Sequence, residues 1–256
     1  MKKMFMILTV FVLGMTFVGS STVIAGGDQN RGEIGQGDTY ENNCEDQPCF
    51  EDAPKPGSSS ALIMQSVAET SDLDEDEIKH LLFTREEEKM ARDVYRVLYE
   101  KWGNPIFANI IESEQNHMDA MANLLAFYGI DDPVTNDETG VFKDTVIKDL
   151  YESLISRGLN TEIDAILVGA YIEEFDILDI WAAYDETDEE RIQKVYQNLY
   201  EGSYNHLQAF VYVYELENDN GYLYEPTQLS PDEYNLVMTF DTQARQNQKS
   251  KQPKGR

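Results

Sequence analysis

Glu114 and His117 are three residues apart in a stretch, Pro105 to Tyr128, that we predict to be helical. Side chains at this spacing lie on one face of an α-helix. In helix bundles that hold metal ions between carboxylates, a Glu-x-x-His pair offers one oxygen and one nitrogen ligand from a single helix. At about 100° per residue, both side chains fall inside the apolar stripe of this helix rather than opposite it. The pair is therefore a candidate half of a metal site that faces a protein interior.

Three further predicted helices place a ligand-type side chain on their apolar faces. Glu87 falls near the middle of the face in 74–101, Glu174 lies within the face in 161–184 with Glu173 at its rim, and His206 lies in the face of the helix that ends at 217. Burying three carboxylates without partners costs several kcal/mol each, whereas a whole domain is stable by only about 5–15 kcal/mol. A pair of divalent or trivalent metal ions would neutralise them. The alternative for each helix alone is a glutamate with a buried stem at the rim, or a hydrogen-bonded core histidine.

Start and stop signals define the elements that must position these residues. Asp74 with Glu77 predicts a capped helix start, Gly103-Asn104-Pro105 a break, and Gly129 a helix end. Shorter helices are expected at 143–156 and 231–238. Two short turns make two antiparallel pairs of long helices, and a connection of about 30 residues joins the pairs. The expected fold class is all-α: a ferritin-like four-helix bundle with one long crossover, plus short accessory helices, over residues 71–240.

The segments outside the bundle carry different expectations. Residues 1–25 have the order of a secretory signal, so the protein is expected outside the cytoplasm, with an uncleaved membrane anchor as the alternative. Residues 26–70 are expected to be a disordered acidic linker in which Cys44 and Cys49 form a disulfide, and 241–256 a basic flexible tail. The net charge of −28 becomes −30 without 1–25, since that segment holds Lys2 and Lys3 and no acid. Such a charge argues against nucleic acid and anionic membranes as partners.

Four blocks in order resemble the ferritin-like family of unknown function DUF2202. They are Arg85-Glu86-Glu87-Glu88-Lys89-Met90, Ser113-Glu114-Gln115-Asn116-His117-Met118, Gly169-Ala170-Tyr171-Ile172-Glu173-Glu174-Phe175-Asp176, and Gly202-Ser203-Tyr204-Asn205-His206-Leu207. The likeness covers 73–235 and extends more distantly to rubrerythrins and other di-iron carboxylate bundles. It implies metal at Glu87, Glu114, His117, Glu174 and His206.

One position departs from the wider pattern. The fourth helix of such bundles usually carries a second Glu-x-x-His, but Ser203 stands three residues before His206. Two iron ions remain the expected cofactor, with a single metal ion, or manganese or zinc, as alternatives. Glu173, Ser203 and Tyr95 are candidate alternates or neighbours of the ligands. We identify no catalytic residue.

The expected function is oxidoreductase chemistry toward O₂ or a peroxide, of a ferroxidase or peroxidase type, with metal ions and the oxidant as partners. The alternatives are a metal-binding or iron-sequestering module without turnover, and a structural or interaction bundle without metal. A homodimer is left open.

Overall fold

The computed structural model describes residues 73–218 and 221–241, and this part of the chain contains six helices and no strand. The helices are α2 (Glu75–Trp102), α3 (Pro105–Tyr128), α4 (Thr145–Gly158), α5 (Glu162–Glu186), α6 (Glu190–Glu217) and α7 (Pro231–Met238). The expected all-α bundle is therefore confirmed. The expected signal segment, linker, Cys44–Cys49 disulfide and tail beyond 241 fall outside the described residues.

The helix ends follow the signals in the sequence. The Asp74 side chain accepts hydrogen bonds from the backbone N–H groups of Asp76 and Glu77, while Glu77 accepts one from Asp74, which completes a capping box. Asn104 caps α3, with Pro105 at its first position. Gly103 and Gly129 end α2 and α3 with φ of 69° and 68°, a left-handed conformation that favours glycine. These local interactions fix where the long helices begin and end.

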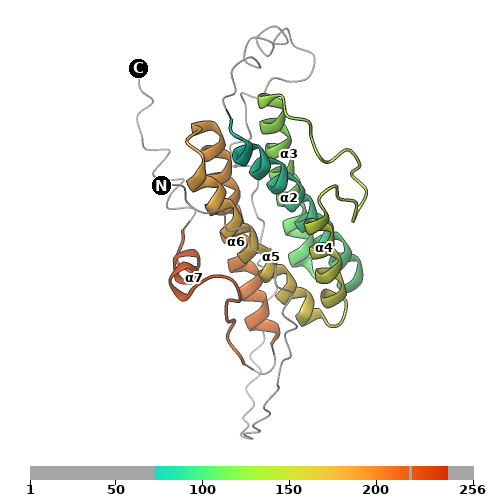
Figure 1. Ribbon diagram of the computed structural model, residues 1–256. Coiled ribbons are helices and arrows are strands. Elements are labelled where there is room, and N and C mark those ends of the chain that lie inside the picture. Colours follow the sequence, from blue (N-terminus) through green and yellow to red (C-terminus); the bar gives the residue numbers. More distant parts are fainter. Residues whose placement is uncertain (1–72, 219–220, 242–256) are drawn as a thin grey trace, which may run out of the picture. The chain divides into compact units, whose positions relative to one another are not determined.

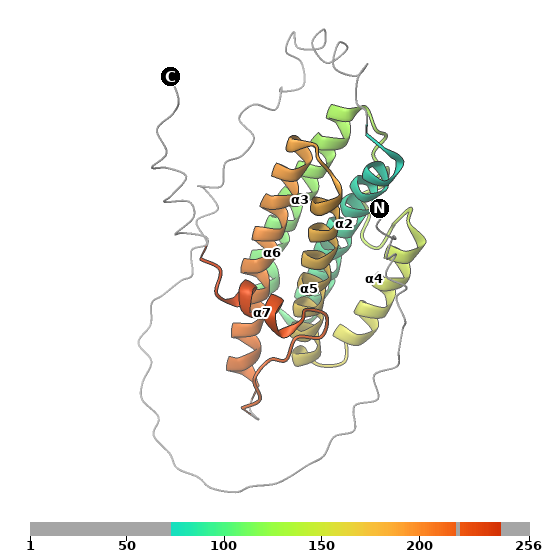
Figure 2. The same ribbon diagram turned by 60° about the vertical axis from the view of Figure 1, so that its left-hand side comes forward.

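The four long helices form two pairs, α2 with α3 and α5 with α6 (Figures 1 and 2). The chain crosses from α3 to α5 through a long connection that contains α4, and α4 packs against α2 and α5. The short helix α7 packs against α6. Because of this arrangement, side chains from α2, α3, α5 and α6 can meet at one level inside the bundle. Within the described residues, no helix is both long and apolar enough to cross a membrane.

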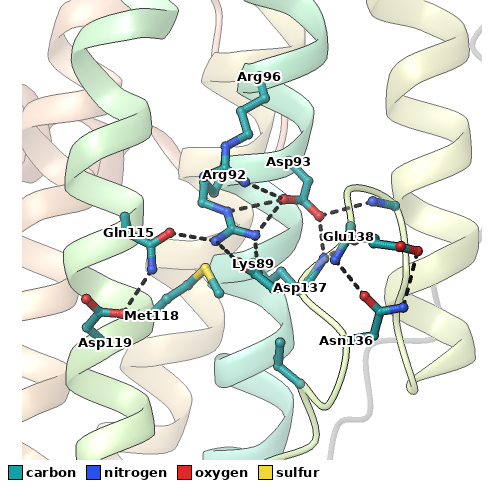
Figure 3. Close-up of polar contacts among 12 residues, drawn as sticks. Lys89, Arg92, Asp93, Arg96, Gln115, Met118, Asp119, Asn136, Asp137 and Glu138 are labelled. Carbon is teal, nitrogen blue, oxygen red and sulfur yellow. Dashed lines mark hydrogen bonds and ion pairs between the residues drawn. The ribbon is translucent and has the colours of Figure 1, made fainter.

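A buried ionic network attaches the crossover connection to α2 (Figure 3). Asp93 accepts hydrogen bonds from Lys89 Nζ at 2.5 Å and from Arg92 Nη2 at 2.9 Å, and all three side chains are fully buried. Asp93 also accepts from the backbone N–H of Gly140, and Lys89 donates to the carbonyl of Glu138 at 2.8 Å. The network therefore holds the connection against the outer side of α2.

Neighbouring elements cover the middle of α2 on every side, so this part of the helix has no solvent-exposed face. Every residue from Thr84 to Tyr95 is buried. On another part of its circumference, Glu86 accepts hydrogen bonds from the backbone N–H groups of Lys143 and Asp144 at the start of α4. Polar residues of α2 therefore point in several directions, each toward a different neighbour.

Candidate metal centre

Five buried side chains from the four long helices form two overlapping groups of metal-ligand type. One group is Glu88, Glu114 and His117, and the other is Glu114, Glu173 and His206; in each, the potential ligand atoms lie within 4.8 Å of one another. The glutamate side chains are at most 3% exposed, and the imidazoles of His117 and His206 are 11% and 10% exposed. The groups lie near the boundary between two hydrophobic clusters, one containing Val94 and Phe210 and the other Met121 and Val195.

Glu114 belongs to both groups and offers one carboxylate oxygen to each. Its Oε2 lies 3.1 Å from Nδ1 of His117, and its Oε1 lies 2.9 Å from Nδ1 of His206. Glu88 approaches the first imidazole at 3.2 Å and Glu173 the second at 3.3 Å. Within the described chain, Oε1 of Glu114, Nδ1 of His206 and Oε1 of Glu88 are buried without a hydrogen bond. Carboxylate and imidazole atoms thus converge in close ion-pair contacts, several of them without hydrogen-bond geometry, as potential ligands around a metal ion do.

Neighbouring residues orient the imidazoles and one carboxylate. Nε2 of His206 lies 2.9 Å from the hydroxyl of Ser113, which leaves Nδ1 facing the carboxylates. The His117 ring lies so close to Gly202 that a Cβ there would be 2.6 Å from Nε2. The buried hydroxyl of Tyr95 donates a 2.5 Å hydrogen bond to Glu173. A hydrogen-bond partner on the far side of a ligand fixes its orientation in metal sites. Tyr95 therefore lies beside the carboxylate of Glu173.

Ser203 lies beside a carboxylate that the sequence analysis missed. Its hydroxyl donates to Asp176 of α5 and to the carbonyl of Leu199. The other oxygen of Asp176 is buried and has no hydrogen-bond partner among the described residues. Burial, and then the charges of Glu88, Glu173 and Glu114, raise the pKa of Asp176 well above its ordinary value. A carboxylate from α5 thus adjoins the position where the fourth helix has serine. The sequence offered one signal for Asp176: it stands three residues after Glu173, and side chains at this spacing lie on the same face of a helix.

The structure brings Glu114, His117 and His206 together and places Glu87 and Glu174 elsewhere. Glu174 points to the segment before α7, where it accepts hydrogen bonds from the hydroxyl of Tyr224 and from the backbone N–H groups of Thr227, Gln228 and Leu229. Glu87 lies outside both groups, beside Asp179. The adjacent residues Glu88 and Glu173 lie at the centre instead. Other elements pack against α2 and α5 on more than one side, so neighbouring carboxylates of each helix contact different elements.

Without metal, the centre is a set of buried ion pairs. Burial would raise the pKa of Glu114, but the positive charges of His206 and His117 outweigh it and hold the pKa well below the ordinary range. Burial would lower the pKa of His206, but Glu173 and Glu114 raise it to about 10. Burial is the main cause that raises the pKa of Glu88 to about 8. At neutral pH, both the His206 imidazole and the Glu88 carboxyl therefore hold protons that a metal ion would have to displace.

These shifts predict that the metal-free protein loses stability as pH rises. Glu88 moves from 4.5 to about 8 and His206 from 6.5 to about 10, so the folded state keeps protons that the unfolded chain releases. Between pH 6.5 and 8, the free energy of unfolding should fall by about 1.4 kcal/mol per pH unit for each such proton. Urea unfolding in the presence of a chelator measures this slope. Glu88→Gln should make it shallower, and stability that is constant or rises over this range would refute the prediction.

The described residues form a helical bundle with a buried carboxylate–imidazole centre, and comparison with known proteins shows the family of the chain. Residues 77–241 match the family described as "Uncharacterized protein domain (DUF2202)", and the chain belongs to this family. It is 46% identical over 171 residues to "Uncharacterized protein MJ0754" of Methanocaldococcus jannaschii, a match covering 67% of this chain and 91% of that protein. The crystal structure of hypothetical protein MJ0754 from Methanococcus jannaschii is similar with a TM-score of 0.64, over 68% of this chain and 97% of that one.

Proposed function

We propose that the protein binds two first-row metal ions, iron in the first place, and uses them to reduce O₂ or a peroxide. One ion would be held by Glu88, Glu114 and His117, and the other by Glu114, Glu173 and His206. The observation that supports this most strongly is the position of Glu114, because each of its two carboxylate oxygens lies beside a different imidazole. A carboxylate in this position can bridge two ions, as in carboxylate-bridged helix bundles.

The residues present fit a metal pair in charge and chemistry. Three glutamates converge with two histidines, and Asp176 adjoins them. Two divalent ions would satisfy the buried oxygens of Glu88 and Glu114 that have no hydrogen bond in the described chain. Oxygen and imidazole nitrogen suit iron, manganese and zinc, whereas copper(I) prefers sulfur ligands.

The surrounding side chains prepare the site for small oxidants. Ser113 holds His206 with Nδ1 toward the carboxylates, and Tyr95 holds Glu173. The glutamates are almost fully buried, and the imidazole edges are the more exposed part of the two groups. This burial restricts access by a large substrate, which favours O₂ or hydrogen peroxide. A ferrous pair would supply the two electrons that reduce peroxide to water. Glu88 and His206 would release the protons they hold when metal binds.

Reaction with peroxide tests this function. Protein loaded anaerobically with ferrous iron should oxidise two Fe²⁺ for each hydrogen peroxide, consuming two protons and releasing two waters. Stopped-flow absorbance should show this reaction to be faster than that of the same concentration of free iron. The matched control is Glu112→Gln, which removes an exposed carboxylate of α3 and should leave the reaction unchanged.

The second candidate function is metal binding without turnover. The near-complete burial of the glutamates favours it, because a closed site protects bound iron from oxidants. It predicts two bound ions and no peroxide consumption above the rate of free iron, which would overturn the oxidoreductase proposal.

A further inference from the structure

A second group of buried polar atoms lies beside the metal centre, toward the end of the bundle where α2 begins. Among the described residues, both carboxylate oxygens of Glu87 and Oδ2 of Asp179 have no hydrogen-bond partner there, and the hydroxyls of Thr84 and Tyr196 have none beyond each other. Thr84 and Glu87 are fully buried, and Tyr196 is 1% exposed. A buried polar atom without a partner is costly. Several in one place, from α2, α5 and α6, indicate a group that is completed by something besides protein.

These side chains lie near one another: Thr84 and Glu87 are three residues apart on α2, and the charges of the group act on one another. After burial, the charge of Asp179 is the largest cause that raises the pKa of Glu87. The hydroxyl of Tyr196 lies against that of Thr84, and the charges of Asp179 and Glu87 both raise the pKa of Tyr196 after burial. The atoms that could meet a ligand here are therefore two carboxylates and two hydroxyls.

The group lies between the surface and the metal centre. Toward the surface, the charge of His80 acts on Asp179, and Nε2 of His80 lies 3.1 Å from Glu186, whose side chain is 41% exposed. Toward the centre, Glu87 adjoins Glu88 in sequence and is affected by the charge of Asp176. From His80 to Glu88 the helix rises about 12 Å. Thr84 and Glu87 lie on α2 within this stretch, between His80 and the first metal ligand.

The chemistry of the group favours a cation over a structural polar cluster. Both carboxylate oxygens of Glu87 lack a hydrogen bond within the described chain, so no basic side chain donates to them there. Carboxylates and hydroxyls are the ligands of hard divalent cations. Because the group has no imidazole, it should hold a first-row ion more weakly than the centre does and release it faster.

We propose that Glu87, Asp179 and the hydroxyls of Thr84 and Tyr196 form a second, oxygen-only cation site. Divalent metal ions pass through it from the surface at His80 and Glu186 to the centre. This role in transit rests on the proposed metal centre, whereas binding of a cation at Glu87 and Asp179 does not. The proposal thus makes Glu87 a ligand of this second site, whereas the sequence suggested that it binds metal at the centre.

Two measurements on the full chain test the site. Crystals soaked in Mn²⁺ should show an anomalous density peak between Glu87 and Asp179, in addition to density at the centre. In stopped-flow loading with Co²⁺, Glu87→Gln and Asp179→Asn should each slow loading about tenfold, in the range by which charged routes raise on-rates. The final metal content should be unchanged. Both substitutions replace a buried carboxyl group by an uncharged amide of the same shape, so loss of folding is not expected.

Glu112→Gln is the control for net charge, since it removes one exposed carboxylate and should load at the wild-type rate. Manganese density at the centre alone, or wild-type loading rates in both variants, would overturn the transit site and leave the metal centre in place. No bound metal at either position would overturn both. Slow loading in the control as well would show that overall charge, not this site, governs delivery.

Discussion

Glu114→Ala is expected to remove both metal ions, although it deletes a single carboxylate. Each candidate group uses one oxygen of Glu114, so its loss leaves Glu88 with His117 and Glu173 with His206. A metal ion held by two protein ligands binds far more weakly than one held by three, the usual minimum in catalytic sites. Metal content by mass spectrometry, after anaerobic loading with ferrous iron and desalting, should fall from about two ions per chain to none.

Substitutions at the unshared ligands provide the comparison. Glu88→Ala and Glu173→Ala each remove a carboxylate from one group, so each should retain about one ion per chain. Glu112→Ala, two residues from Glu114 but exposed, should retain both. Circular dichroism checks that every variant stays helical. If Glu114→Ala kept as much metal as Glu88→Ala, Glu114 would not be shared between two ions.

Asp93→Asn is expected to destabilise the fold by about 3–5 kcal/mol, because it leaves buried positive charges without their partner. Lys89 and Arg92 are fully buried, and both donate to the carboxylate of Asp93 (Figure 3). The substitution keeps the shape of the side chain and removes its charge. It also weakens the hydrogen bond that the backbone N–H of Gly140, in the crossover connection, donates to the side chain of residue 93. Chemical denaturation followed by circular dichroism measures the loss.

Asp137→Asn is the matched control for this effect. Asp137 also pairs with Arg92, at 2.6 Å, but its side chain is 63% exposed. Exposed ion pairs contribute roughly 0–1 kcal/mol, so this variant should lose less than 1 kcal/mol. Equal losses from the two substitutions would mean that burial does not determine the strength of the network.

The elements could be predicted from the sequence because their ends depend on local chemistry. The Asp74–Glu77 capping box, Pro105 at the start of α3 and Gly129 at its end all act within a few residues of the chain. The Glu114–His117 pair was expected on the apolar face of its helix, and both side chains are buried there, because α3 has a buried face and a solvent-exposed face. An apolar stripe marks the interior on such a helix.

The partner carboxylates on α2 and α5 could not be chosen in the same way. Residues 84–95 and 172–177 are buried without interruption, so hydrophobic periodicity does not separate the side that faces the centre from the sides that face other neighbours. Glu86, Glu87 and Glu88 point respectively to the start of α4, to the group with Asp179, and to the centre. Only the positions of the crossover connection and the segment before α7, which come from tertiary packing, determine this choice.

Anomalous diffraction at the iron absorption edge, on crystals loaded anaerobically with ferrous iron, tests the two-metal centre most directly. Two iron peaks about 3.5–4 Å apart are predicted. Glu114 should lie between them, with Glu88 and His117 on one ion and Glu173 and His206 on the other. A single peak, or two peaks that do not share Glu114, would contradict the bridged centre on which the proposed function rests.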